Sequence, residues 1–201
     1  MSGVTTFHLI RHASYDMLGR VLAGRTPGHA LNAIGRGEAA RVAEALATRP
    51  IAAVISSPLE RAQETARCIA ERLSLSVETE PALNEIDFGD WTGMTFEALH
   101  ALPEWQAFNI FRGAARIPGG ETMLAAQARA VAALARLRLT WPTQELVVVS
   151  HGDMVKGLIA HFLGVPLDLF RRIEIAPASR SVLWLADASA HVDGVNLPPG
   201  A

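Results

Sequence analysis

Short apolar runs and alanine-rich amphipathic stretches alternate along most of the chain. Apolar runs that contain β-branched residues predict strands at residues 6–10, 52–56, 75–79, 146–150 and 181–185. Charged and apolar residues at helical spacing predict helices at residues 36–48, 58–73, 122–138 and 154–163. Because strands alternate with helices, we expect an α/β fold with a mostly parallel sheet and helices on both faces.

Turn and capping residues divide the pattern further. Ser57, Pro58 and Glu60 predict a helix start, with Ser57 as the N-cap of a capping box. The glycines and proline of residues 22–28 indicate an irregular loop. Residues 88–116 mix tryptophan, glycine and short helical patches, which suggests an insertion that covers the substrate.

The chain shows no repeat, no low-complexity tract and no interdomain linker, so we expect one domain over residues 1–201. Pro118-Gly119-Gly120-Glu121 forms a turn signal before the long helix at 122–138. Residues 187–201 are polar and end in prolines and glycine, which predicts a frayed tail.

Composition narrows the class of protein. Half of the 201 residues are hydrophobic and 19% are charged, which favours a folded globule. The net charge of −2 gives no overall attraction to nucleic acid or to an anionic membrane. One cysteine offers no disulfide framework, no apolar stretch is long enough to cross a bilayer, and the first residues lack a signal peptide's charged start. We therefore expect a cytoplasmic protein.

Two predicted strands, far apart in the chain, each end at a histidine. Arg11 and His12 follow the first strand, and His151 with Gly152 follows the strand at 146–150. The carboxyl ends of parallel strands meet at one crevice, so these groups can gather around a phosphate. A neutral imidazole beside a guanidinium can act as a nucleophile. Taken singly, a solvated Arg-His pair and a structural histidine explain the same residues.

Two further groups suit a phosphate ester. Arg61 lies in the first turn of a predicted helix, where a cation opposes the helix dipole unless an anion binds there. An exposed pair with Glu64 is the alternative. Glu85 follows the strand at 75–79 and could protonate a leaving alkoxide, although most loop acids are simply solvated.

A metal site is the weaker interpretation of the first histidine. His8 and His12 stand four residues apart, as in a helical zinc motif. The segment is a predicted strand, however, and no glutamate follows His8 at the required place.

Five motifs then occur in a specific order. They are Arg-His, Ser-Ser-Pro-Leu-x-Arg-Ala-x-x-Thr-Ala, Leu-x-Glu-Ile-x-Phe-Gly, Pro-Gly-Gly-Glu and Val-x-Ser-His-Gly. This series resembles the histidine phosphatase superfamily, the phosphoglycerate-mutase-like proteins, from about Phe7 to Leu185. The resemblance implies a three-layer α/β/α sandwich without a metal or other cofactor. It implies that His12 is the nucleophile that becomes phosphohistidine.

The resemblance also assigns the neighbours of that histidine. Arg11, Arg61 and His151 match the other members of the phosphate pocket, and Glu85 matches the proton donor. Gly152 would let the backbone approach the ligand. The implied activity is that of a metal-independent phosphomonoesterase acting on a small phosphorylated metabolite; a homodimer is the weak expectation by analogy.

The chain departs from the family pattern after Arg-His. Ala13 stands where glycine is usual, which is tolerable unless that position needs a positive φ. Ser14 can replace part of the usual Ser/Thr–Asn pair, but the asparagine is missing, which argues against a phosphoglycerate mutase. Arg25, in the 22–28 loop, is expected to hold a second anionic group of the substrate.

Alternatives to a phosphatase stay open at this point. A phosphomutase would return the phosphoryl group to a second hydroxyl, and a phospho-ligand binding protein would have lost catalysis. Specificity is expected from residues 88–116. The candidate walls and contacts there are Trp91, Trp105, Phe108, Phe111, Arg112 and Arg116.

Overall fold

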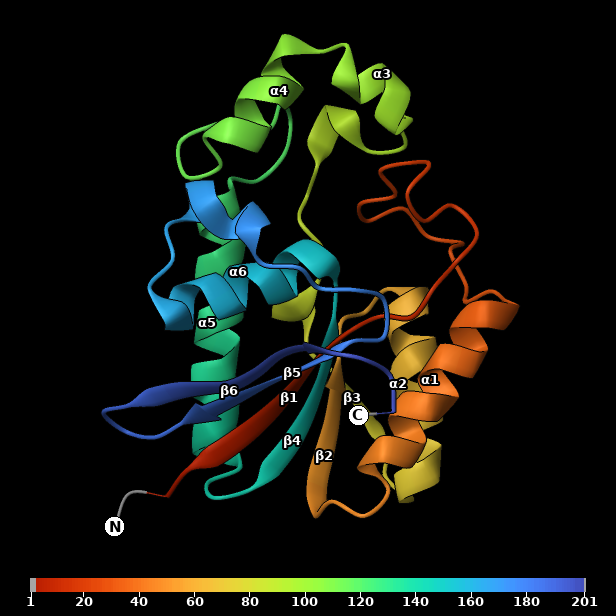
Figure 1. The fold of residues 1–201 in the computed structure, drawn as a ribbon, viewed down its shortest axis with the longest axis vertical. Coiled ribbons are helices and arrows are strands. Elements are labelled where there is room, and N and C mark those ends of the chain that lie inside the picture. The colour runs from red at the N-terminus through yellow and green to blue at the C-terminus, as the bar shows by residue number, and fades with distance from the viewer. Residues whose placement is uncertain (1–2, 201) are drawn as a thin grey trace.

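A six-stranded sheet forms the centre of the computed structural model, which describes residues 3–200 (Figure 1). Its strands are β1 (Thr5–Arg11), β2 (Ile51–Ser56), β3 (Val77–Thr79), β4 (Glu145–Ser150), β5 (Arg180–Leu185) and β6 (Ala190–Leu197). Their order in the sheet is β3-β2-β4-β1-β5-β6. β1 to β4 run parallel, whereas β5 is antiparallel to both β1 and β6. The mostly parallel sheet is thus confirmed.

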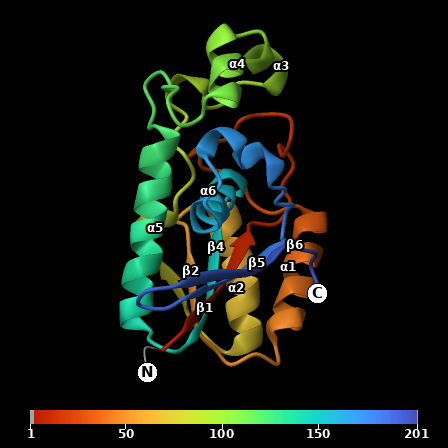
Figure 2. The ribbon, with the colours of Figure 1, turned by 60° about the vertical axis from the view of Figure 1, so that its left-hand side comes forward.

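Helices cover both faces of this sheet. They are α1 (Ala33–Leu46), α2 (Glu60–Leu73), α3 (Phe96–His100), α4 (Pro103–Ile110), α5 (Met123–Thr140) and α6 (Gly152–Leu163), with 3-10 turns η1 (Pro81–Leu83), η2 (Gly89–Trp91) and η3 (Leu167–Arg172). α1 and α2 lie on one face, and α5 and α6 lie on the other (Figure 2). Between residues 3 and 200, no helix has the length and hydropathy for a membrane crossing.

Alternation along the central strands builds the two cores. Phe7 and Leu9 of β1 pack with α5 and α6, whereas Ile10 packs with α1 and α2. All three side chains are fully buried. Because β1 and β4 are buried on both faces, their apolar runs are nearly continuous, which is typical of parallel strands. This burial fixes the ends of both strands at the edge where the predicted histidines lie.

The predicted frayed tail is wrong. Residues 190–197 form β6, which pairs with β5 in a hairpin where Trp184 faces His191. β6 is an edge strand, and most of its residues are exposed or half-buried. Backbone hydrogen bonds to β5 hold β6 in the sheet, and an edge strand needs few apolar side chains. The polar composition of residues 190–197 therefore did not reveal the strand.

The predicted capping box is also wrong. α2 begins at Glu60, and Leu59 at its N-cap position makes no side-chain cap bond. The hydroxyl of Ser57 bonds instead to the His151 ring. The first predicted helix starts three residues early, at Ala33, because Asn32 caps it through the Gly35 N–H.

Residues 88–116, called the cap from here on, lie above the carboxyl edge of the sheet (Figure 1). Trp91, Trp105 and Phe108 pack against one another there, with ring centroids 5.3 to 5.9 Å apart. The cap therefore has a small aromatic core of its own.

Candidate active site

The two strand-end histidines lie side by side, as predicted. β1 and β4 are parallel neighbours in which Arg11 faces Ser150. The His12 N–H donates to the Ser150 carbonyl at 2.8 Å, and the rings of His12 and His151 are 5.3 Å apart. His12 is 3% exposed and His151 is fully buried. Parallel pairing therefore brings together residues that are 139 positions apart in sequence.

His12 is held with one ring nitrogen available for attack. Nδ1 lies 2.9 Å from the Ala13 carbonyl, which can only accept, so Nδ1 carries the proton. Nε2 then has a lone pair, which receives a bond from Arg61 Nε at 3.3 Å. Burial, followed by the charges of Arg61 and Arg11, holds the pKa of His12 well below its usual range. His12 is thus a neutral imidazole at physiological pH.

Arg61 is a buried cation rather than an exposed helix residue. It is 2% exposed, and its Nη2 donates to the Gly24 carbonyl at 2.8 Å. The alternative pair with Glu64 does not form, because the Glu64 carboxylate accepts the Leu31 N–H. Burial lowers the pKa of Arg61, whereas nearby Glu85 raises it. Within residues 3–200 this buried guanidinium has no carboxylate in ion-pair contact, an arrangement that suits an anionic ligand.

Arg11 approaches the same place from the β1 end. Its Nη1 donates to the Ile175 carbonyl at 2.7 Å. A Cβ added to Gly152 would lie 3.1 Å from Arg11 Nε. Gly152 therefore leaves room for this guanidinium, and both residues line the pocket.

Alanine in place of the usual glycine is accommodated at position 13. Ala13 is fully buried and is not among the residues with positive φ. Its N–H donates to the Thr65 hydroxyl, which in turn donates to the Arg61 carbonyl. The Thr65 hydroxyl thus joins the loop after β1 to α2. It fixes the segment of Arg11 relative to the segment of Arg61.

His151 lies beside His12, behind the phosphate-binding groups, and does not itself line the pocket. The Ser57 hydroxyl lies 2.7 Å from His151 Nε2, and in the tautomer with the proton on Nδ1 it donates to that nitrogen. His151 Nδ1 is buried without a hydrogen-bond partner within residues 3–200, 3.9 Å from Glu85 Oε2. Burial, Arg61 and His12 keep the pKa of His151 well below its usual range. A phosphate oxygen is a suitable acceptor for this orphaned N–H.

Glu85 is not a solvated loop acid. Its side chain is 13% exposed, and Oε1 accepts the Ile86 N–H at 2.9 Å. Burial first, and then the nearby carboxylate of Asp153, raise the pKa of Glu85 from 4.5 to about 7. A carboxyl group with this pKa can both give and take a proton near neutral pH.

Arg25 does not reach the pocket lining, which corrects its expected role. Its Nε donates to the Glu85 carbonyl at 2.8 Å, and its Nη2 donates to Glu121 at 2.8 Å. Arg129 Nη2 donates to the same two partners, at 3.0 and 2.7 Å. We call Arg25, Glu121 and Arg129 the Glu85 brace. The Pro-Gly-Gly-Glu motif supplies its central carboxylate.

Ser14 also lies outside the pocket lining, contrary to expectation. Its N–H and hydroxyl both donate to Glu38, at 2.8 and 3.0 Å. The Glu38 carboxylate on α1 therefore satisfies this serine and turns it away from the phosphate-binding groups.

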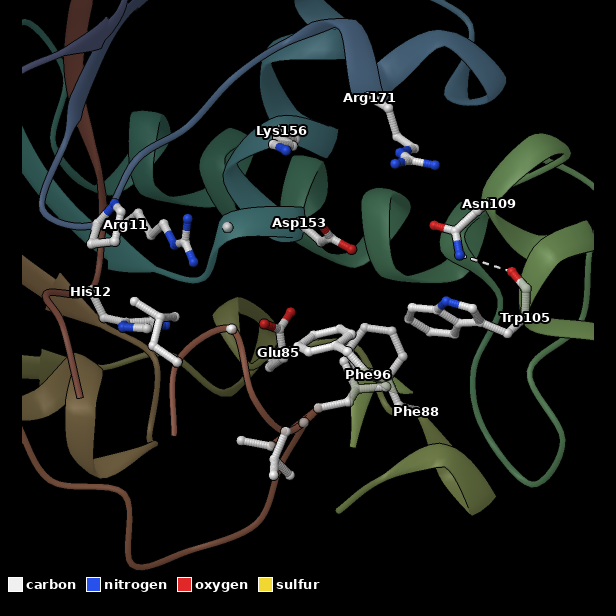
Figure 3. A pocket seen from close by; sticks show the side chains of 18 of the residues that line it. Arg11, His12, Glu85, Phe88, Phe96, Trp105, Asn109, Asp153, Lys156 and Arg171 are labelled. Carbon is white, nitrogen blue, oxygen red and sulfur yellow. Dashed lines mark hydrogen bonds between the residues drawn. The ribbon is translucent and has the colours of Figure 1, made fainter. Parts of the chain in front are cut away.

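The pocket has a volume of about 830 Å³ and opens between the sheet edge and the cap (Figure 3). Arg11, His12, Arg61 and Glu85 line one end, called the phosphate end from here on. Of the expected walls in the cap, Trp105 and Arg112 line the pocket. Trp91 and Phe108 are buried in the aromatic core of the cap, Phe111 is 59% exposed, and Arg116 is exposed and absent from the lining.

Sequence reasoning missed several residues of the lining. Tyr15 packs 5.6 Å from the His12 ring, and its ring contacts the Arg61 guanidinium at 5.4 Å. Asp153, Lys156 and Arg171 also line the pocket. Asp153 and Lys156 lie on the first turns of α6, directly after the His-Gly motif, and that position was the available signal.

His8 and His12 do not share a site. His8 lies within β1, and its Nε2 is 2.9 Å from Glu145. In the described part of the chain, no three His, Cys, Asp or Glu side chains gather as a metal site.

Comparison with known proteins agrees with this geometry. Residues 7–198 match the family model for the histidine phosphatase superfamily (branch 1). An uncharacterised protein of Mycobacterium tuberculosis is 37% identical, and the match covers 98% of both chains. A probable phosphoglycerate mutase, GpmB of Yersinia enterocolitica, is 31% identical over 81% of this chain and 83% of its own.

A solved structure gives the same result. The native mycobacterial glucosyl-3-phosphoglycerate phosphatase superposes with a TM-score of 0.86 at 26% identity, covering 96% of this chain and 99% of the other. The mixed α/β sandwich expected from the motifs is thereby confirmed. The chain belongs to the histidine phosphatase superfamily (branch 1) and is an enzyme of its phosphatase and mutase class.

Proposed function

We propose that the protein is a metal-independent phosphomonoesterase that hydrolyses a small phosphorylated metabolite through a phosphohistidine at His12. One observation carries the proposal: a neutral, buried His12 has its Nε2 lone pair beside Arg61, in a pocket that Arg11 and Glu85 also line. The fixed cations stabilise charge that develops on the phosphoryl oxygens.

The reaction divides into two steps that use the same groups. In the first, a bond forms between His12 Nε2 and phosphorus as the bond from phosphorus to the leaving oxygen breaks. Glu85 gives its proton to that oxygen. In the second, Glu85 takes a proton from water as the water oxygen displaces His12. Inorganic phosphate leaves, and Glu85 is protonated again.

The second half of the reaction distinguishes the alternatives. A phosphomutase, favoured by the likeness to the GpmB protein, would transfer the phosphoryl group to another hydroxyl instead of water. A binding protein without catalysis would not form phosphohistidine, and the presence of both His12 and Glu85 in one pocket argues against it. The missing asparagine after Ser14 argues against the mutase.

The test is hydrolysis of p-nitrophenyl phosphate in EDTA by wild type and His12→Ala. We expect wild-type activity and a loss of at least about 10³-fold in the variant. Acid-quenched wild type should carry acid-labile phosphate. His161→Ala is the matched control, because His161 is exposed on α6 and lies outside this pocket. Activity that needs a divalent metal, or that survives His12→Ala, would contradict the proposal.

Mutase activity has a separate readout. Phosphate released to water should equal the substrate consumed for a phosphatase, whereas a mutase conserves ester phosphate.

We also propose the cytoplasm as the location, because a single cysteine offers no disulfide framework.

A further inference from the structure

The part of the pocket away from His12 carries positive charge that the phosphate end does not use. Arg11, Lys156 and Arg171 follow one wall in that order, whereas Phe88 and Phe96 lie on the opposite side (Figure 3). Arg11 belongs to the phosphate end. Lys156 and Arg171 therefore form a separate pair of cations, called the outer cations from here on.

Arg112 also lines this part of the pocket, but a carboxylate already compensates its charge. Arg112 is 6% exposed, and its Nη1 donates to Asp153 at 2.7 Å. Its guanidinium also lies between the rings of Phe108 and Phe170, 4.4 and 4.3 Å from their centroids. Arg112 and Asp153 thus form a fixed ion pair that anchors the cap to α6. Because the two charges compensate each other, this pair offers no net charge to a ligand.

Within residues 3–200, neither Lys156 nor Arg171 has such a close carboxylate partner. The nearest carboxylate to Lys156 Nζ is Glu174 at 3.9 Å, and Glu174 is 73% exposed, so solvent screens the contact. Lys156 itself is only 17% exposed. Arg171 is exposed, and within residues 3–200 its side chain has no ion pair or hydrogen bond. Two cations that face one cavity repel each other, and an anion bound between them would offset that repulsion.

The opposite wall is apolar. Phe88 and Trp105 are 3% and 6% exposed, and both line the pocket together with Phe96. Burial of a ligand's apolar body against these rings removes apolar surface from water. The lining therefore separates into a phosphate end, an apolar side and a cationic wall.

We propose that the substrate is a phosphate monoester whose leaving group carries a second anionic group, carboxylate or phosphate, bound by Lys156 and Arg171. This inference rests on the proposed function and adds the class of leaving group. The apolar body of that leaving group lies against Phe96 and Trp105. The outer cations take the role that the sequence suggested for Arg25.

Matched aryl phosphates test the second anion. The substrates are 3- and 4-carboxyphenyl phosphate and the corresponding neutral carbamoylphenyl phosphates, which have similar shape. We expect wild type to favour a carboxylate over its carboxamide by about tenfold in kcat/KM at one ring position or both. 4-(Phosphonomethyl)phenyl phosphate then shows whether a dianionic second group is preferred to a carboxylate.

Variants assign the preference to residues. Lys156→Gln and Arg171→Gln should each lower the carboxylate-to-carboxamide ratio about threefold or more, and the double variant should abolish it. Lys156→Arg should restore most of the ratio. Arg172→Gln is the control, because Arg172 is the exposed neighbour of Arg171 in sequence, lies outside the pocket lining and changes the net charge equally.

The outcomes separate the two proposals. A wild-type ratio of about one at both ring positions, or a ratio that survives the double variant, would overturn the second-anion subsite while leaving the phosphatase intact. Failure to hydrolyse any of these esters would count against the proposed function instead. In that case, calorimetric Kd values for 4-carboxybenzylphosphonate and its carboxamide would still test the subsite, with the same expected ratio and the same variants.

Discussion

The phosphate end and the cap side of the pocket are built in different ways. At the phosphate end, Arg11, His12 and Arg61 each bond to a backbone carbonyl, and His12 and Arg61 are almost fully buried. On the cap side, Phe96 and Arg171 lie on short helical turns, where Phe96 is half-buried and Arg171 is exposed. The first arrangement fixes charges before the substrate arrives. The second can vary in sequence without disturbing them, so we expect changes at the phosphate end to affect kcat and changes on the cap side to affect KM.

The largest effect should come from Glu85→Gln, which keeps the shape but removes the proton. We expect kcat for alkyl phosphates to fall about 10²-fold or more, because an alkoxide leaving group needs protonation. The loss for p-nitrophenyl phosphate should be smaller, since nitrophenolate leaves without a proton. Equal losses for both kinds of substrate would argue against a role as proton donor.

The same variant should gain stability at alkaline pH. The pKa of Glu85 is about 7 in the fold and 4.5 without it, so the folded chain holds a proton that the unfolded chain releases in that window. Wild-type stability from this group therefore falls as pH rises through the window. At pH 8 we expect Glu85→Gln to be more stable by about 2 to 3 kcal/mol in urea unfolding, and at pH 4 the difference should vanish.

A substitution in the Glu85 brace should have the next largest effect on kcat. Glu121→Gln removes the carboxylate that joins Arg25 to Arg129, so the Glu85 carbonyl is held less firmly. We expect kcat to fall about tenfold with little change in KM. Arg136→Gln is the control, because Arg136 lies on α5 with Arg129 but is 57% exposed and pairs with Glu80 instead. A change in KM alone would place Glu121 in substrate binding.

A substitution in the cap should change KM rather than kcat. Phe96→Ala removes an apolar ring that lines the pocket and lies outside the phosphate end. We expect KM to rise about fivefold for an aryl phosphate, with kcat within about twofold of wild type. Steady-state kinetics decide it, and a large fall in kcat would mean that the two sides of the pocket are coupled.

The smallest effect should be a shift of the pH profile. Asp153 raises the pKa of Glu85, so Asp153→Asn should lower that pKa. The alkaline limb of kcat/KM, which reports loss of the Glu85 proton in the free enzyme, should then move to lower pH. If the alkaline limb did not move, it would report the titration of a group other than Glu85.

The grouping of the strand-end residues could be predicted because strand ends obey a simple rule. Arg11, His12 and His151 each follow a buried apolar run, and parallel pairing alone decides that such residues meet. Arg61 was predicted from its place at a helix start. For these residues, local pattern and topology carry enough information.

Residues whose partners lie far along the chain could not be predicted in the same way. Arg25 appeared free to meet substrate, but its hydrogen bonds go to Glu85, Asp87 and Glu121. The partner of Ser14 is Glu38 on α1, which no motif includes. Residues 190–197 form a strand because β5 offers an edge, and the polar composition does not reveal this. Tertiary partners decide such positions, and a single sequence does not show them.

The position of β1 and β4 at the middle of the sheet has a consequence for how the molecule opens. Each has a paired strand on both sides, and their amides are buried in the body of the fold. We expect amide protons there to exchange with solvent only when the whole domain unfolds, and those of the short helices α3 and α4 to exchange through local opening. A local opening of α3 and α4 would therefore leave the paired strands that hold His12 and His151 intact.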